Sequence, residues 1–209
     1  RLNLSDLLQD AINRNPEMKP IKKDSRISLK DTQIGNLTNR ITFISKAIQR
    51  LTKLQIIYFA NSPFTYDNIA VDWEDANSDY AKQYENEELS WSNLKDLTDV
   101  ELYNCPNMTQ LPDFLYDLPE LQSLNIACNR GISAAQLKAD WTRLADDEDT
   151  GPKIQIFYMG YNNLEEFPAS ASLQKMVKLG LLDCVHNKVR HLEAFGTNVK
   201  LTDLKLDYN

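Results

Sequence analysis

The segments Leu97–Cys105 (LTDVELYNC) and Leu121–Asn129 (LQSLNIACN) share the nine-residue pattern L-x-x-L-x-L-x-x-N/C. Five further segments follow it, the first two more loosely: DSRISLKDT (24–32), LQIIYFANS (54–62), IQIFYMGYN (154–162), LGLLDCVHN (179–187) and LTDLKLDYN (201–209). Across the seven copies the first, fourth and sixth places are apolar in 20 of 21 cases. A random sequence of this composition would supply about nine. The chain is therefore predicted to be built from a repeat.

The ninth place of the copies gives an independent check on this alignment. It always holds a small residue that can form hydrogen bonds: Thr32, Ser62, Cys105, Asn129, Asn162, Asn187 and Asn209. Such a side chain, where the chain turns out of a strand, can satisfy backbone groups of adjoining coils that water cannot reach. We therefore expect a structural turn ladder along the molecule.

This repeat resembles that of the leucine-rich-repeat family, and the resemblance covers about residues 24 to 209. The segment LPDFLYDLPEL (111–121) is also similar to the family's convex-side pattern. The resemblance implies an α/β fold: a curved solenoid with a parallel concave sheet of about seven short strands and an irregular convex side with helices. The degenerate copies and insertions further resemble surface leucine-rich-repeat proteins of gut-dwelling bacteria, which implies an extracellular or cell-surface location.

The spacing between copies predicts the domain organisation. Successive copies begin 30, 43, 24, 33, 25 and 22 residues apart, whereas leucine-rich repeats usually span about 20 to 29 residues. We predict a solenoid over 24–209 with insertions at 65–91 and 133–153, and an N-terminal helical cap at 1–23. The chain is expected to continue beyond Asn209, because an uncapped coil exposes its core.

Two of the long intervals have helical patterns. Ile41, Ile44, Ile48 and Leu51 recur at helical spacing, which predicts a convex-side helix with one buried stripe. In the interval after Asn129, Ser133 and Gln136 form a potential capping box ahead of a second apolar stripe, made by Leu137, Trp141 and Leu144. We therefore expect a helix in each interval.

The insertion at 65–91 is acidic and aromatic. It carries eight acidic residues against Lys82 alone, and four aromatic residues at near-helical spacing: Trp73, Tyr80, Tyr84 and Trp91. The favoured interpretation is that this stripe packs on the solenoid while the acids face water. A flap that contacts a ligand is the alternative.

Composition excludes several classes of function. The net charge of -7 and the pI near 4.9 disfavour binding to nucleic acid or to an anionic membrane, because both need a basic surface. No apolar run approaches the length of a membrane-spanning helix. Three Cys without a C-x-x-C spacing, and His186 and His191 five residues apart, do not match a metal site. No cofactor is predicted.

The candidate binding surface follows from the strand register. The fourth and sixth places point inward, so the fifth place and its neighbours lie on the concave surface, where five of the nine Tyr fall. Tyrosine offers a large contact area at low entropic cost. Seven strands would extend this surface over about 29 Å. The predicted partner-binding residues are Tyr58, Glu101, Tyr103, Asn125, Tyr158, Tyr161, Asp183, His186 and Tyr208.

No catalytic residue is predicted. Cys184 falls on an inward place, and Cys128 lies two strands from His186, about 10 Å away, too far for the hydrogen bond that would activate a thiolate. The predicted function is a non-enzymatic binding module for a protein or glycan. The alternatives are a spacer or stalk of a larger surface protein, and the targeting region of an enzyme that continues beyond Asn209.

Overall fold

The computed structural model describes residues 44–63, 65–71, 89–192, 194–196 and 200–209. The chain divides into two compact units, 1–37 and 38–209, and every described residue belongs to the second. Several predicted features lie outside the described residues: the helical cap at 1–23, the first copy with Thr32, and the aromatic residues Trp73, Tyr80 and Tyr84.

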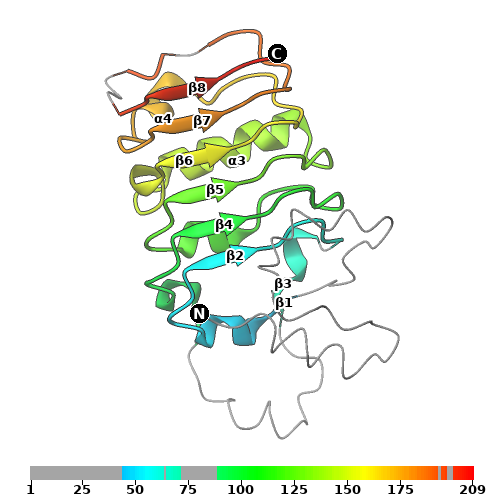
Figure 1. The fold of residues 1–209 in the computed structure, drawn as a ribbon, viewed down its shortest axis with the longest axis vertical. Coiled ribbons are helices and arrows are strands. Elements are labelled where there is room, and N and C mark those ends of the chain that lie inside the picture. The colour runs from blue at the N-terminus through cyan, green and yellow to red at the C-terminus, as the bar shows by residue number, and fades with distance from the viewer. Residues whose placement is uncertain (1–43, 64, 72–88, 193, 197–199) are drawn as a thin grey trace, which may run out of the picture. The chain divides into compact units, whose positions relative to one another are not determined.

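A parallel six-stranded sheet forms one layer of this unit, in the order β2-β4-β5-β6-β7-β8 (Figure 1). The strands are β2 (Ile56–Tyr58), β4 (Asp99–Glu101), β5 (Ser123–Asn125), β6 (Ile156–Tyr158), β7 (Leu181–Asp183) and β8 (Asp203–Lys205). Each occupies the third to fifth places of one copy, and every neighbouring pair aligns the same places. The predicted solenoid is confirmed, with six of its strands among the described residues.

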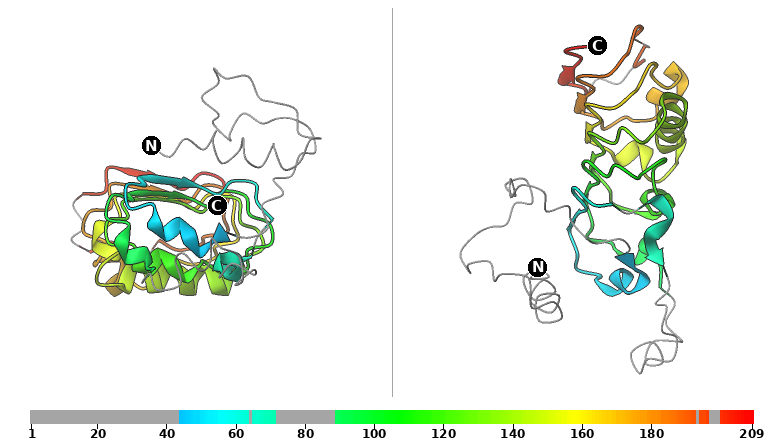
Figure 2. Two further views of the ribbon diagram at one scale, coloured as in Figure 1. Left: turned by 90° about the horizontal axis from the view of Figure 1, so that it is seen from below. Right: turned by 90° about the vertical axis from the view of Figure 1, so that its right-hand side faces the viewer.

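The segments between strands carry short helices. They are η1 (Lys46–Arg50), η2 (Tyr66–Asn68), η3 (Trp91–Asn93), η4 (Asp113–Asp117), α3 (Ala134–Asp146), η5 (Gly151–Lys153) and α4 (Ser170–Leu173). Figure 2 shows the sheet in one layer and α3 and α4 in the other. This is the predicted irregular convex side.

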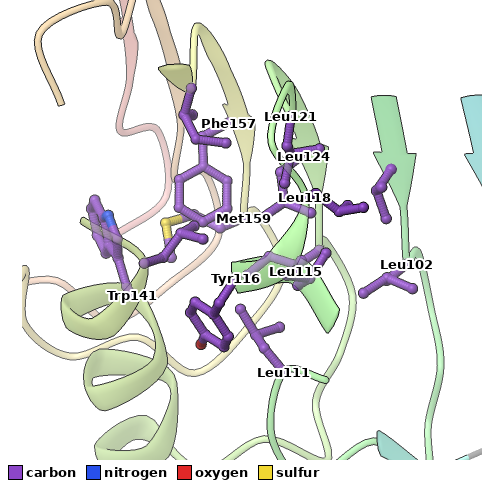
Figure 3. Close-up of a cluster of buried hydrophobic side chains, with 14 of the residues drawn as sticks. Leu102, Leu111, Leu115, Tyr116, Leu118, Leu121, Leu124, Trp141, Phe157 and Met159 are labelled. Atoms are coloured by element: carbon purple, nitrogen blue, oxygen red, sulfur yellow. The ribbon is translucent and has the colours of Figure 1, made fainter. Parts of the chain in front are cut away.

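The core lies between these two layers. Every fourth-place and sixth-place side chain from β2 to β7 is buried, with exposed fractions of 9% or less. The aromatic centre is Trp141 of α3, which meets the ring of Phe157 edge to face with centroids 5.8 Å apart (Figure 3). It meets the ring of Phe167 in the same way, with centroids 5.0 Å apart. The alternation of buried and exposed places along each strand thus sets which side chains can reach a partner.

The leucines of the segment 111–121 are buried. Leu111, Leu115, Leu118 and Leu121 are all at most 1% exposed. The short helix η4 in this segment also buries Phe114 and Tyr116. Trp91 stacks on Phe114 with ring centroids 4.3 Å apart. This one described member of the aromatic stripe therefore packs against the solenoid.

The helix predicted after Ser133 is confirmed. Ser133 is the N-cap of α3 and its hydroxyl accepts a hydrogen bond from the Gln136 amide. Leu137, Trp141 and Leu144 are fully buried. Gln136 Nε2 donates to Asp140 Oδ1 at 2.7 Å, so its side chain is directed along the helix toward Asp140.

The single helix predicted over residues 41–51 is wrong. The described part of this segment forms a two-residue strand, β1 (Ile44–Ser45), followed by the 3-10 helix η1. β1 pairs in parallel with β3 (Ile69–Val71), which belongs to the acidic insertion. A short apolar run is compatible with either a helix or a strand. Here the segment is extended because it pairs with β3, 25 residues further along the chain.

Asp140 is a buried carboxylate on α3 that joins this helix to the preceding coil. Its side chain is 6% exposed and accepts hydrogen bonds from the Leu111 amide at 2.9 Å and from Gln136 Nε2 at 2.7 Å. Loss of water around the carboxylate raises the pKa of Asp140, although these two hydrogen bonds oppose the rise. The folded chain therefore binds this proton more tightly than the unfolded chain does.

Asp140→Asn is expected to raise the free energy of unfolding by up to about 1 kcal/mol at pH 7. Its amide can accept from Leu111 and donate to a reoriented Gln136, while the desolvated charge is removed. The stability contributed by Asp140 is fully present below the unfolded pKa, about 3.9, and is lost as pH rises through the raised folded pKa. Urea unfolding should therefore show a smaller gain at pH 4 than at pH 7. Equal gains at both would contradict this account.

Candidate functional site

The ninth-place side chains lie inside the turn that follows each strand. Asn129 Nδ2 donates to the carbonyls of Leu102 and Ile126 at 2.7 and 2.9 Å, and its Oδ1 accepts from the Cys105 amide at 2.7 Å. Each asparagine of the ladder thus binds its own coil and the coil before it. Asn162, Asn187 and Asn209 repeat this arrangement one coil at a time.

The two earlier described copies use shorter side chains at the same place. Cys105 Sγ donates to the Phe59 carbonyl at 2.9 Å, and Ser62 Oγ donates to the Ala60 carbonyl at 3.2 Å. Burial raises the pKa of the Cys105 thiol to about 11. The ladder therefore holds the coils in a fixed stack, and Cys105 is a protonated structural residue within it.

The eighth place has a left-handed backbone in all six described copies. Its φ angles lie between 51° and 64° at Asn61, Asn104, Cys128, Tyr161, His186 and Tyr208. The turn out of each strand requires this conformation, which Asn tolerates and which costs other side chains about 1 to 2 kcal/mol. The two Asn residues indicate a left-handed backbone already in the sequence. The Tyr and His residues at the same place do not.

Three of these eighth-place residues form a ring stack, made of Tyr161, His186 and Tyr208. The Tyr161 and His186 ring centroids are 4.3 Å apart with planes at 17°, and those of His186 and Tyr208 are 4.3 Å apart at 11°. Stacked aromatic pairs stabilise by about 0.5 to 1.5 kcal/mol each, which offsets part of the backbone strain. The stack ends at the small residue Cys128.

Two hollows flank this row where the strands end. The first, about 380 Å³, is lined by the ring stack and by Arg130, Asn162, Asn163 and Asn187. The second, about 280 Å³, lies toward the previous coils and is lined by Tyr103, Asn104, Pro106, Cys128, Arg130 and Gly131. Arg130 borders both. We call the surface formed by the two hollows and the ring stack the rim.

The fifth-place side chains form a separate row across the sheet. We call the surface made by the third-place and fifth-place side chains the strand face. Register places Tyr58 beside Glu101, and Tyr158 between Asn125 and Asp183. Asn125 Nδ2 donates to Glu101 Oε1 at 3.2 Å, and Asp183 pairs with Lys205 at 3.5 Å. Tyr58 is 51% exposed. Partial burial, followed by the charges of Glu101 and Asp99, raises its pKa.

The structure therefore separates the predicted partner-binding residues into two rows. Tyr58, Glu101, Asn125, Tyr158 and Asp183 belong to the strand face, whereas Tyr103, Tyr161, His186 and Tyr208 belong to the rim. Sequence reasoning missed Arg130, which directly follows the ninth place of its copy. The sequence signal available for it was a basic residue directly after the ninth place, followed by Gly131.

The remaining cysteines have structural surroundings. Cys184 is fully buried, and desolvation strongly raises its pKa. Cys128 is half-buried, and Tyr161 stands between it and His186 in the eighth-place row. Among the described residues, no group of three His, Cys, Asp or Glu side chains is placed to hold a metal ion. None of the helices described is long and apolar enough to cross a membrane.

Comparison with known proteins gives three findings. A leucine-rich repeat protein from Bacteroides eggerthii has a solved structure that is 61% identical over 94% of this chain and 32% of its own, with a TM-score of 0.75. Toll-like receptor 7 of Drosophila melanogaster is 31% identical over 107 residues, which is 50% of this chain and 7% of the receptor. An internalin from Listeria monocytogenes is 21% identical over 81% of this chain and 46% of its own, with a TM-score of 0.47.

No protein-family model matches the chain. The chain spans about a third of the Bacteroides protein and a small fraction of the receptor. The evidence for the family is therefore the nine-place repeat, the register of six parallel strands, and the similarity to a solved leucine-rich repeat structure over nearly the whole chain. On these grounds the chain belongs to the leucine-rich-repeat family.

Proposed function

We propose that this chain is a non-enzymatic module that binds a protein partner through its strand face and rim. The observation that carries the proposal is the distribution of exposed apolar surface. Among the described residues, five of the eight exposed large hydrophobic side chains lie on these two rows: Ile56, Tyr58, Tyr103, Tyr161 and Tyr208. Concentrated exposed apolar surface usually marks an interaction site.

The scaffold beneath these side chains supports binding without reorganisation. Each strand is aligned with its neighbours place for place, and the buried asparagine ladder joins successive coils. A surface that is already ordered loses little conformational entropy on association. Solenoids commonly use such an extended face for recognition.

The relatives support the same class of function. Leucine-rich-repeat proteins are generally non-enzymatic binding proteins, and one relative is by name a receptor. The proposal therefore includes an extracellular or cell-surface location. The partner's identity is left to experiment, and a glycan is the competing class of ligand.

Replacing Tyr103, Tyr158 and Tyr161 together by Ala is expected to weaken partner binding by at least about tenfold, because aromatic residues dominate interface energies. The thermal midpoint should change by only a few degrees, since Tyr103 and Tyr161 are 36% and 42% exposed. Proteins captured by the wild-type chain should be purified, and their affinities for both chains measured by surface plasmon resonance.

The matched control is the double variant Val177→Ala and Leu192→Ala. Both side chains are more than half exposed but lie outside the nine-place copies, so this variant should bind like wild type. Undiminished binding by the triple Tyr variant would reject the surface. A glycan array hit lost in the triple variant, with no protein binder, would instead identify a carbohydrate receptor.

A further inference from the structure

Arg130 is the one charged residue among the twelve that line the two hollows of the rim. It is exposed and forms no ion pair within the described part of the chain. Arg143 shows the contrast: its guanidinium pairs with Asp113 at 2.5 Å and lies 3.7 Å from the centre of the Tyr116 ring. Arg130 is therefore available to a ligand in a way that Arg143 is not.

Contacts with both adjacent coils hold the backbone of Arg130 in place. Asn163 Nδ2, from the following coil, donates to the Arg130 carbonyl at 3.3 Å. On the other side, a Cβ added at Gly131 would lie 2.6 Å from the Pro106 carbonyl oxygen and 2.7 Å from that of Met108. Only glycine allows this close approach. Arg130 thus borders both hollows from a backbone position that the adjacent coils hold in place.

The surroundings of Arg130 differ in charge from the strand face. In the six described copies the third and fifth places carry Asp99, Glu101, Asp183 and Asp203 against Lys205 alone, whereas the lining of the hollows contains no acidic residue. The chain as a whole has a net charge of -7. The hollows are therefore a local site where a negatively charged group would meet no repulsion from the side chains lining them.

The ring stack further restricts what can bind there. Its members lie face to face at 4.3 Å, so both faces of His186 are covered, and the electropositive ring edges remain for contact. The middle ring offers no open face on which a sugar could stack, so such stacking is limited to the ends of the row. A carboxylate suits the site better, because ring edges, the Tyr hydroxyls and a guanidinium fork are all suited to an anionic planar acceptor.

We propose that Arg130 binds an Asp or Glu side chain of a protein partner, which enters the rim beside the ring stack. This inference rests on the proposed protein-binding function and assigns the chemistry of one contact within it. The rim extends over five consecutive copies, from Tyr103 to Tyr208, or about 19 Å at the spacing of neighbouring strands. That length fits an extended peptide segment with an acidic residue opposite Arg130.

The test uses a random twelve-residue peptide library displayed on phage and selected on the intact wild-type chain. We expect enriched peptides to carry Asp or Glu at one shared position and to bind Arg130→Gln at least about tenfold more weakly. Arg130→Lys should recover only part of this loss, because an ammonium keeps the charge without the fork. Binding should also weaken between 50 and 500 mM salt.

Arg190→Gln is the matched control, since Arg190 is exposed and lines neither hollow. Its binding should equal that of the wild type. Selected peptides without an acidic residue, peptides that bind Arg130→Gln as tightly as wild type, or a selection that yields no binder would each overturn the inference. Peptides lost by the triple Tyr variant but kept by Arg130→Gln would overturn it while leaving the proposed function standing.

Discussion

Replacing Asn129 by Ala is expected to lower the free energy of unfolding by about 3 to 5 kcal/mol, because it leaves buried backbone groups without partners. Asn129 is fully buried. Its loss would orphan the Cys105 N–H and the Leu102 carbonyl, whereas the Ile126 carbonyl would keep the bond from Asn162. Each orphaned buried group costs about 1 to 3 kcal/mol, and a small cavity adds to this. Urea unfolding followed by circular dichroism measures the change.

Asn209 provides a matched control inside the same molecule. It forms the same three bonds, to the carbonyls of Cys184 and Leu206 and from the Val189 amide, but its side chain is exposed. Water can replace these partners, so Asn209→Ala should cost less than about 1 kcal/mol. Similar losses in the two variants would show that burial of the ladder does not determine its contribution.

As a single substitution, Trp141→Ala is expected to lower the free energy of unfolding by about 3 to 5 kcal/mol. The side chain is fully buried in α3 and contacts Phe157 of β6 and Phe167. Its removal would open a cavity at the junction of the helix and sheet layers (Figure 3). The same urea titration reports the loss.

Trp141→Phe should be far milder, at less than about half that loss. The Trp141 indole N–H is buried and has no hydrogen-bond partner in the described part of the chain. Phenylalanine keeps most of the apolar volume and removes this unsatisfied donor, which offsets part of the lost packing. If Phe proved as damaging as Ala, the cavity would not be the cause of the loss.

The strand positions could be predicted from the sequence because the same apolar pattern recurs in each copy of the repeat. Alternation of apolar and polar residues places Val100 and Leu102 inward and Glu101 outward, and the ninth-place residue marks the turn that follows each strand. The helix α3 was equally clear, since Ser133 caps it and its apolar stripe has helical spacing. Both signals are local.

The segment around Ile44 could not be predicted in the same way. Its apolar spacing fits a helix, but the strand pairing with Ile69 is a contact between segments distant in sequence. The division of the candidate site into strand face and rim has the same origin. It depends on the direction in which the chain leaves each strand, and hence on a left-handed residue at the eighth place.

By itself the sequence determined the family, the register of the six described strands and the class of the ladder residues, because each follows from a short pattern that the chain repeats. Only the tertiary structure decided that Tyr161, His186 and Tyr208 stack, that Arg130 borders two hollows beside the closely packed Gly131, and that this arginine forms no ion pair among the described residues. These features join residues from different coils, and their distances are set by the turn geometry and the spacing of neighbouring strands, which no single copy of the repeat contains.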